Sequence, residues 1–464
     1  MSAIAAELSI TARWMLPMTV RGEVLEEHSL IVRDGRILDV LPAAEARRKY
    51  RAGAALERPT HVLMPGLVNA DTQAAASLLH GFGAPGARGA RVPRSVRLAR
   101  GHAGTLCMRD GALLSIARML KGGVTCFADR SPNPAQTAAA AAEQGIRAAI
   151  GMPVADTTDS ADSADSAGAT GAPAQGAAES LTRALALRDE WKGHPGIVTF
   201  FAPRDAARLS DATFGRLAVI AGELDAGVCL DLHESAAAVA DSLARHGVRP
   251  IERLDAFGLL TPDFTAVHMT HLDASDIDRA QRSGIAACLC PESDFDGAHA
   301  AALAAAGLRL ALGSGAAGEE SLWSAVRLVP LLARRNAGAP DRPATDRPAT
   351  DRVANDWPAP WDVLAMATRG GAGALGLDAE IGTLGIGKWA DLCCIDLDAP
   401  ALQPTHEPAA PLVFRGSRDM VTDVWVAGRQ LLAGSRFTRL DWPATAARAA
   451  AWVGRIHDEE AESW

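Results

Sequence analysis

The sequence predicts an α/β protein: a (β/α)8 barrel of the TIM type with a small β-sandwich domain built from both chain ends. Short apolar strands alternate with alanine-rich stretches of helical length throughout the middle of the chain. Segments near both ends instead show alternating apolar residues with turn signals, which is typical of antiparallel β-structure. The length of 464 residues, with 48% hydrophobic residues, suits one large core and one small domain.

The middle of the chain supplies eight predicted barrel strands. One is the apolar run that ends before Asp71, and the other seven cover residues 123–128, 146–153, 197–203, 228–233, 265–270, 285–290 and 308–313. Helices are expected between the strands, for example over residues 212–226 and 273–283. Repeated β-α units imply a parallel sheet, and eight of them close into a barrel whose chemistry lies at the carboxyl ends of the strands.

The domain boundaries follow from the same pattern of apolar residues and turn signals. Residues 29–37 read as a hairpin, with Asp34 and Gly35 in the turn between two strands. We expect the chain to divide into a first part of the β domain at 1–61, the barrel at 62–379, a second part of the β domain at 380–440 and a C-terminal helix or tail at 441–464.

Three segments interrupt the regular pattern. Residues near 156–178 and 338–356 are repetitive, contain few large apolar residues and are expected to be surface insertions. Residues 81–104 follow the first barrel strand and carry Arg88, Arg91, Arg94, Arg97 and Arg100. This segment is either a solvated basic loop or an anion-binding lid over the barrel mouth, because guanidinium groups suit carboxylate and phosphate.

Charge and cysteine content narrow the class of protein. The net charge of −9 argues against a nucleic acid or an anionic membrane as partner. No apolar run reaches the ~18 residues of a membrane span, and the first 13 residues lack the basic and apolar regions of a signal peptide. The seven cysteines are too scattered for a disulfide scaffold, so Cys288, Cys290, Cys393 and Cys394 are expected to be buried reduced thiols. A cytoplasmic protein is expected.

Several of these segments resemble the amidohydrolase superfamily, nearest its TRZ/ATZ chlorohydrolase and aminohydrolase group, which includes methylthioadenosine and S-adenosylhomocysteine deaminases. The resemblance extends from about residue 30 to residue 440 and is carried by residues 62–70, 266–272, 290–293 and 366–400. It implies the barrel fold and hydrolysis of C–N or C–Cl bonds in nitrogen heterocycles. It also implies a single zinc ion, held by a His-x-His pair, a third His and an Asp, and assembly into homodimers or larger oligomers.

At the positions that this resemblance assigns to the zinc ligands, the chain carries other residues. Asp71 and Gln73 stand at the His-x-His pair, Asp231 stands at the third His, and Gly313-Ser314-Gly315 replaces the segment with the metal-binding Asp. A carboxylate and a carboxamide cannot coordinate zinc as two imidazoles do. We therefore expect no zinc cofactor.

The resemblance also assigns roles to the neighbouring residues. Glu234 matches a carboxylate that contacts the substrate ring and shuttles protons, and His268 matches a histidine that faces the zinc-bound water. Arg204 and Asp294 stand where the family has His and Asn. His233 lies two residues after Asp231, so the two side chains would share a strand face, and His233 is a weaker candidate for a shifted ligand.

Three functional hypotheses follow. The first is a pseudoenzyme that binds a small heterocyclic or anionic ligand, or pairs with itself or an active relative. The second is a metal-free hydrolase with catalytic residues Asp71, Asp231, Glu234 and His268 and substrate contacts from Arg204, Gln73 and Asp294. The third is a site for Mg²⁺ or Mn²⁺, since the side chains of Asp71, Gln73, Asp231 and Glu234 offer oxygen ligands.

Overall fold

A computed structural model describes residues 3–79, 102–131, 133–156, 176–204, 206–294, 300–316, 320–337 and 358–461. Nearly all of both low-complexity segments, and the arginines at 88, 91, 94, 97 and 100, lie outside these residues. The chain divides into two compact units. Unit 1 comprises Met1–Asn69, Arg118–Cys126 and Glu319–Arg439, and unit 2 comprises Ala70–Ala117, Phe127–Gly318 and Leu440–Trp464.

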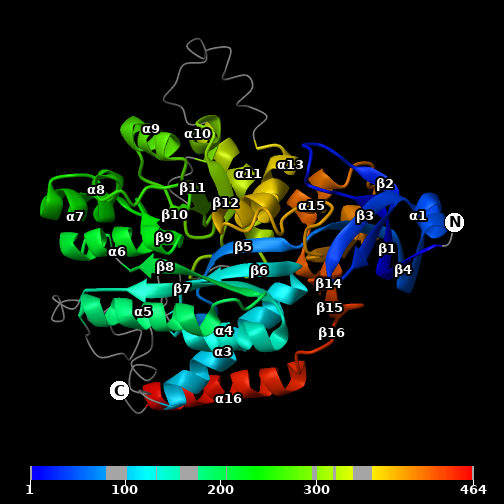
Figure 1. Cartoon of the computed structure of the whole chain (residues 1–464), viewed down its shortest axis with the longest axis horizontal. Helices are drawn as coiled ribbons and strands as arrows, with labels where there is room; N and C mark the ends of the chain where they lie inside the picture. Colours follow the sequence, from blue (N-terminus) through cyan, green and yellow to red (C-terminus); the bar gives the residue numbers. More distant parts are fainter. Residues whose placement is uncertain are drawn as a thin grey trace, which may run out of the picture. The chain divides into compact units, whose positions relative to one another are not determined.

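Eight strands form the predicted barrel (Figure 1). They are β5 (Leu67–Thr72), β6 (Val124–Asp129), β7 (Arg147–Val154), β8 (Ile197–Pro203), β9 (Val228–Leu232), β10 (Phe264–His268), β11 (Ala286–Leu289) and β12 (Arg309–Leu312). They follow one another around the sheet in chain order, and a parallel bridge between Thr72 and Gly315 brings the first strand to the segment after the last. The prediction of a parallel eight-stranded barrel is confirmed.

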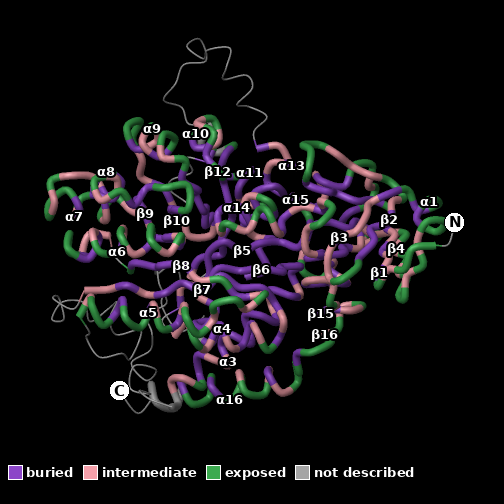
Figure 2. Tube along the Cα trace, viewed as in Figure 1, coloured by how far each residue is buried: buried purple, intermediate pink, exposed green. Residues whose placement is uncertain are grey.

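The barrel strands are buried on both faces, which explains why the sequence shows continuous apolar runs there. Every residue of β5 and of β6 is buried. Helices follow the strands on the outside of the barrel, with exposed outer faces (Figure 2). They are α4 (Pro134–Gln144), α5 (Ala177–Trp191), α6 (Asp211–Glu223), α7 (Ala236–His246), α8 (Pro250–Ala256), α9 (Ala274–Ser283) and α10 (Ala300–Ala305).

Side-chain caps fix where several of these helices begin. Ser210 accepts a hydrogen bond from the Thr213 N–H at the start of α6, and Ser235 does the same for Ala238 at the start of α7. At the start of α9, Asp273 and Asp276 form a reciprocal capping box. These caps lie just after the ends of β8, β9 and β10, so they also fix the course of the segments that leave the barrel mouth.

The chain ends form a second sheet, within unit 1, as predicted. Its strands are β1 (Ile4–Met15), β2 (Leu25–Arg33), β3 (Arg36–Pro42), β4 (Tyr50–Pro65), β13 (Leu392–Asp396), β14 (Val421–Val426), β15 (Arg429–Ala433) and β16 (Arg436–Phe437). Their order is β16-β15-β14-β13-β4-β1-β2-β3, so β13 pairs with β4 and joins the two ends of the chain. Ile10, Leu63, Leu392 and Trp425 contribute to one core from both ends.

The predicted hairpin at residues 29–37 is present between β2 and β3. Asp34 and Gly35 have φ values of 53° and 71°, which suits the twist of a tight hairpin turn. A Cβ on Gly35 would lie 2.6 Å from the carbonyl oxygen of Ala427, so only glycine fits this position.

The remaining helices are distributed between the two units. They are α1 (Ala43–Lys49), α3 (His102–Lys121), α11 (Trp323–Ala337), α13 (Pro360–Ala365), α14 (Gly371–Ala374), α15 (Ala409–Arg415) and α16 (Trp442–Ala461). Among the described residues, no helix combines the length and apolar content needed to cross a membrane. All seven cysteines are free thiols and buried, which confirms the prediction made for Cys288, Cys290, Cys393 and Cys394.

Candidate active site at the barrel mouth

A charged cluster lies at the carboxyl ends of the barrel strands in unit 2. It consists of Asp71 at the end of β5, Arg130 directly after β6, Asp231 near the end of β9, His268 at the end of β10 and Asp294 after β11. We call these five residues the mouth cluster. Parallel strands bring their carboxyl ends to one rim, so residues more than two hundred positions apart in the sequence meet here.

Arg130 binds two carboxylates of the mouth cluster at once. Its Nε atom lies 2.5 Å from Oδ1 of Asp71, and its Nη2 atom lies 2.6 Å from Oδ1 of Asp231. The side chains of Arg130 and Asp71 are only 11% and 2% exposed, whereas Asp231 retains 30% exposure. The guanidinium therefore bridges the two acidic residues that sequence reasoning placed at metal-ligand positions.

Arg130 was missed by sequence reasoning. Its position in the sequence could have identified it, because it comes two residues after the end of the predicted strand 123–128. That is the rim where barrel enzymes carry their functional residues. Its partners could not be read from the chain, because the pairing depends on which strand ends face one another.

The ion pairs determine the charge states in the mouth cluster. Burial alone disfavours a charged guanidinium, but the carboxylates of Asp231 and Asp71 outweigh burial and hold the pKa of Arg130 above its usual value. Burial would raise the pKa of Asp231, yet the charges of Arg130 and His268 lower it overall. Both groups are therefore ionised at neutral pH.

His268 lies between two carboxylates. Its Nδ1 atom is 2.8 Å from Oδ1 of Asp294, and its Nε2 atom is 3.6 Å from Oδ1 of Asp231. Burial lowers the pKa of His268, but the hydrogen bond to Asp294 and the surrounding negative charges raise it to about 9. At neutral pH the imidazole is therefore a cation that donates its Nδ1 proton to Asp294.

Backbone contacts across the barrel seam hold Asp71 in place. Its carbonyl oxygen accepts hydrogen bonds from the N–H groups of Ser314 and Gly315, both at 3.0 Å. Its Oδ2 atom accepts the Cys290 thiol at 3.6 Å. A Cβ on Gly313 would lie 2.7 Å from the Cβ of Asp71, so the close approach of these two segments requires glycine.

The other predicted site residues lie around this cluster. Glu234 follows β9 and offers a carboxylate oxygen within 4.8 Å of ligand atoms on Asp231 and His268, a spacing at which three groups can share a metal ion. Arg204 follows β8 and is exposed, and Gln73 follows β5 and is half-buried. In the described part of the chain, the ion pairs of the mouth cluster include neither of these last two side chains.

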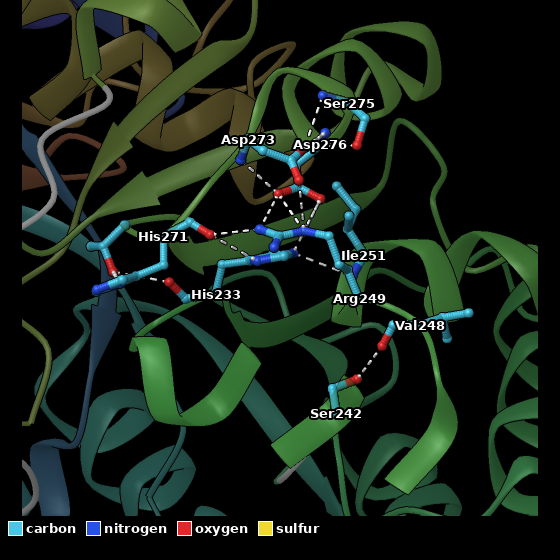
Figure 3. A network of polar contacts seen from close by, with 10 residues as sticks. His233, Ser242, Val248, Arg249, Ile251, His271, Asp273, Ser275 and Asp276 are labelled. Carbon is cyan, nitrogen blue, oxygen red and sulfur yellow. Dashed lines mark hydrogen bonds and ion pairs between the residues drawn. The ribbon is translucent and has the colours of Figure 1, made fainter. Parts of the chain in front are cut away.

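His233 does not share a face with Asp231, so the geometry expected for a shifted ligand is wrong. β9 ends at Leu232, and His233 has a φ of 53°, which turns its side chain away from the mouth cluster. Figure 3 shows its buried ring between the segments around α8 and α9: Nδ1 lies 3.2 Å from the carbonyl oxygen of His271, and Nε2 accepts the Ile251 N–H at 3.3 Å. The ring is satisfied as a neutral imidazole, and burial lowers its pKa to about 4.

Arg249 braces the segments that leave β9 and β10. Its guanidinium contacts Asp276 through two nitrogen atoms and donates to the carbonyl oxygen of His271 at 2.9 Å (Figure 3). The Thr270 hydroxyl contacts the carbonyl oxygens of His233 and Glu234, each at 2.9 Å. These contacts fix the backbone that carries Glu234 beside the mouth cluster.

Comparison with known proteins agrees with this architecture. The family model described as "Amidohydrolase family" matches residues 62–431. A 5-methylthioadenosine/S-adenosylhomocysteine deaminase of Teredinibacter turnerae is 34% identical over 458 residues, which cover 97% of this chain and 98% of that protein. A deaminase of the same name from Saccharophagus degradans is 31% identical over 469 residues, which cover 98% of each chain.

Solved structures give the same result. An adenosine deaminase of Xanthomonas campestris, solved with bound zinc, is 34% identical and superimposes with a TM-score of 0.85, covering 98% of this chain and all of that chain. An atrazine chlorohydrolase of Arthrobacter aurescens, also in complex with zinc, reaches a TM-score of 0.77 at 19% identity, covering 96% of this chain and all of that chain, and supports the fold alone. With a family model over most of its length and relatives above 30% identity along nearly all of it, this chain belongs to the amidohydrolase family.

Proposed function

We propose that this protein is a member of the amidohydrolase family that binds a small nitrogen heterocycle at the barrel mouth without zinc-dependent hydrolysis. The observation that carries the proposal is the bridge from Asp71 through Arg130 to Asp231, with contacts of 2.5 and 2.6 Å. The ligand class comes from the relatives, whose names describe deaminases of adenine-containing compounds.

The donor set of the mouth cluster does not fit a zinc ion. Zinc sites in proteins use four His, Cys or carboxylate ligands, or three such ligands with the fourth position open to water or substrate. Here Asp71 and Asp231 are committed to a guanidinium, and a divalent ion beside that fixed charge would be repelled. In the segment after β12, Ser314 and Gly315 donate backbone N–H groups to the carbonyl oxygen of Asp71, and neither residue has a carboxylate.

The mouth cluster nevertheless offers complementary groups for a heterocycle. Asp231 is the more exposed of the two bridged carboxylates and can accept from an exocyclic amine. His268 is held by Asp294 and is a cation near neutral pH, so it can donate from Nε2 to a ring nitrogen. An aminated nitrogen heterocycle presents that pairing of donor and acceptor along one edge, whereas a hydrocarbon ring does not.

Metal analysis, calorimetry and an activity assay on one preparation test this proposal. After dialysis against Zn²⁺, zinc content is measured by mass spectrometry, 5-methylthioadenosine binding by titration calorimetry, and turnover by ammonia release. We expect binding, weakened in His268→Gln and unchanged in the surface control Arg282→Gln, without stoichiometric zinc or ammonia. Stoichiometric zinc together with ammonia release would overturn the proposal.

A second candidate is a hydrolase that works without zinc. It is favoured by the ligand atoms of Asp231, Glu234 and His268, which lie within 4.8 Å of one another and could serve as acid and base or hold Mg²⁺ or Mn²⁺. A screen of amino-heterocycles, lactones and cyclic amides, with and without Mn²⁺, separates the two candidates. Turnover that is lost in Asp231→Asn and kept in Arg282→Gln would favour the hydrolase.

A further inference from the structure

We infer that the guanidinium of Arg130 is the resident cation of the barrel mouth, and that neutralising it converts the mouth cluster into a site for a hard divalent cation such as Mn²⁺. This role of Arg130 rests on the proposed function and deepens it. Arg130 is not among the residues to which the family resemblance assigned a role. This role also makes the bridged carboxylates the latent ligands of a metal ion.

The guanidinium of Arg130 contacts carboxylates from two barrel strands at once. Nε of Arg130 donates a hydrogen bond to Asp71, and Nη2 lies at ion-pair distance from Asp231, so a single planar group contacts an oxygen on each of two separate strands. A metal ion joins carboxylates from different strands in the same way, with the ion at the centre. The guanidinium therefore performs the electrostatic task of an ion while remaining covalently attached to the end of β6.

A divalent cation would compete with Arg130 for the same oxygen atoms. The Oδ1 atom of Asp231 is shared by Arg130 at 2.6 Å and His268 at 3.6 Å, and Oδ1 of Asp71 is held by Arg130 at 2.5 Å. An incoming divalent cation must displace a buried positive charge from these oxygens and remain beside it. Like charges at such separations repel strongly in a partly desolvated site.

Several donor groups remain at the barrel mouth when the charge of Arg130 is removed. Asp231, Glu234 and His268 already offer ligand atoms within 4.8 Å of one another, and Asp71 becomes available as a further carboxylate. Three carboxylates favour Mn²⁺ over softer ions, and the imidazole of His268 joins them as a ligand only after it releases a proton. Without Arg130, the buried carboxylate of Asp71 would lose its ion pair, which strongly destabilises a fold.

The test compares three full-length proteins: wild type, Arg130→Met and the matched control Arg130→Lys, which keeps the positive charge. Each is dialysed against Mn²⁺ and desalted, then examined for bound manganese, for thermal stability and for Mn²⁺ affinity by calorimetry. We expect bound Mn²⁺ in Arg130→Met only, with affinity roughly a hundredfold or more above that of the other two proteins. Added Mn²⁺ should raise the unfolding temperature of Arg130→Met alone.

A triple variant keeps the test decisive if Arg130→Met does not fold without metal. Combining Arg130→Met with Asp71→Asn and Asp231→Asn removes the charge and both bridged carboxylates, so this protein should fold without Mn²⁺ and bind none. If Mn²⁺ fails to bind or to rescue Arg130→Met while the triple variant folds, the inference is overturned. It is equally overturned if the triple variant fails to fold, because Arg130 would then act through packing rather than charge.

The results that would overturn this inference differ from those that would overturn the proposed function. Zinc-dependent ammonia release by the wild type would overturn the proposed function whatever the variants do. A wild type that binds a heterocycle without zinc, combined with an Arg130→Met protein that takes up no Mn²⁺, would overturn the inference alone.

Discussion

Arg130 and Asp231 are 101 positions apart in the chain, yet Nη2 of the first lies 2.6 Å from Oδ1 of the second. The same oxygen faces Nε2 of His268 at 3.6 Å, so one carboxylate links two cations. With Asp71 on the far side of Arg130 and Asp294 on the far side of His268, charge alternates across the rim from β5 to the segment after β11. Alternation of this kind compensates buried charges locally, which is the condition under which they can stay ionised.

The titration of His268 should depend on Asp294. We expect the pKa of His268, about 9 in the wild type, to fall towards the ordinary value of ~6.5 in Asp294→Asn, because the variant loses a negative charge and changes the partner of Nδ1. Titration of the imidazole resonances by NMR measures the shift. An unchanged pKa in Asp294→Asn would show that Asp231 and Asp71 alone maintain the charge.

The same group predicts a dependence of stability on pH. Because the folded-state pKa of His268 is raised, its contribution is fully present below about pH 6.5 and is lost as the pH rises to about 9. The shift corresponds to roughly 3 kcal/mol of unfolding free energy. Urea unfolding at intervals from pH 6 to pH 9.5 should show this loss in the wild type and a smaller loss in Asp294→Asn.

Asp129 gives a second pH-dependent contribution, in a more acidic window. This fully buried carboxyl accepts the Ala74 N–H and the Ser131 hydroxyl, both at 2.7 Å, and desolvation raises its pKa to about 6. A raised carboxyl pKa means that stability present below about pH 4 is lost as the pH rises to about 6. We expect Asp129→Asn, which keeps the acceptor oxygen without the charge, to be more stable than the wild type by roughly 1–3 kcal/mol at pH 7.5 and no more stable at pH 4. Calorimetric melting at the two pH values compares the proteins, and equal differences at both values would contradict the prediction.

Asp423 should be a stability determinant of the chain-end sheet. Its buried carboxylate accepts hydrogen bonds from two nitrogen atoms of Arg58, both at 2.9 Å. It also accepts hydrogen bonds from the Gln430 side-chain amide at 3.0 Å and from the Gly434 N–H at 3.2 Å. Replacement by Ala leaves these donors unpaired, so we expect a loss of about 3–5 kcal/mol in urea unfolding. Asp278→Ala, which removes an exposed carboxylate of α9, is the control and should cost no more than about 0.5 kcal/mol.

The C-terminal helix α16 should loosen when Asp110 is replaced. Asp110 lies in α3 and accepts Arg448 Nε at 2.7 Å through one oxygen and the Trp452 indole N–H at 2.8 Å through the other. In Asp110→Ala we expect faster amide hydrogen exchange in residues 442–456, whereas exchange in β9 and β10 stays unchanged. Exchange measured by mass spectrometry reads both regions at once, and a uniform increase would instead indicate global destabilisation.

The sequence by itself determined the order of the elements. Apolar runs of strand length separated by amphipathic helices predict a parallel barrel, because strands buried on both faces need apolar residues at every position. It also determined that Asp71, Asp231, Glu234, His268 and Asp294 lie at one rim, since residues at the ends of parallel strands meet there whatever their distance in the chain.

Only the tertiary structure decided how those residues pair. Arg130 resembles any other basic residue at a strand end until β5, β6 and β9 close into one barrel and place two carboxylates around its guanidinium. His233 shows the opposite case: alternation along an ideal strand puts it beside Asp231, but the strand ends one residue earlier and a positive φ turns the ring away. Strand periodicity is a local property that sequence patterns record, whereas ion pairing and backbone reversal depend on atoms contributed by distant segments.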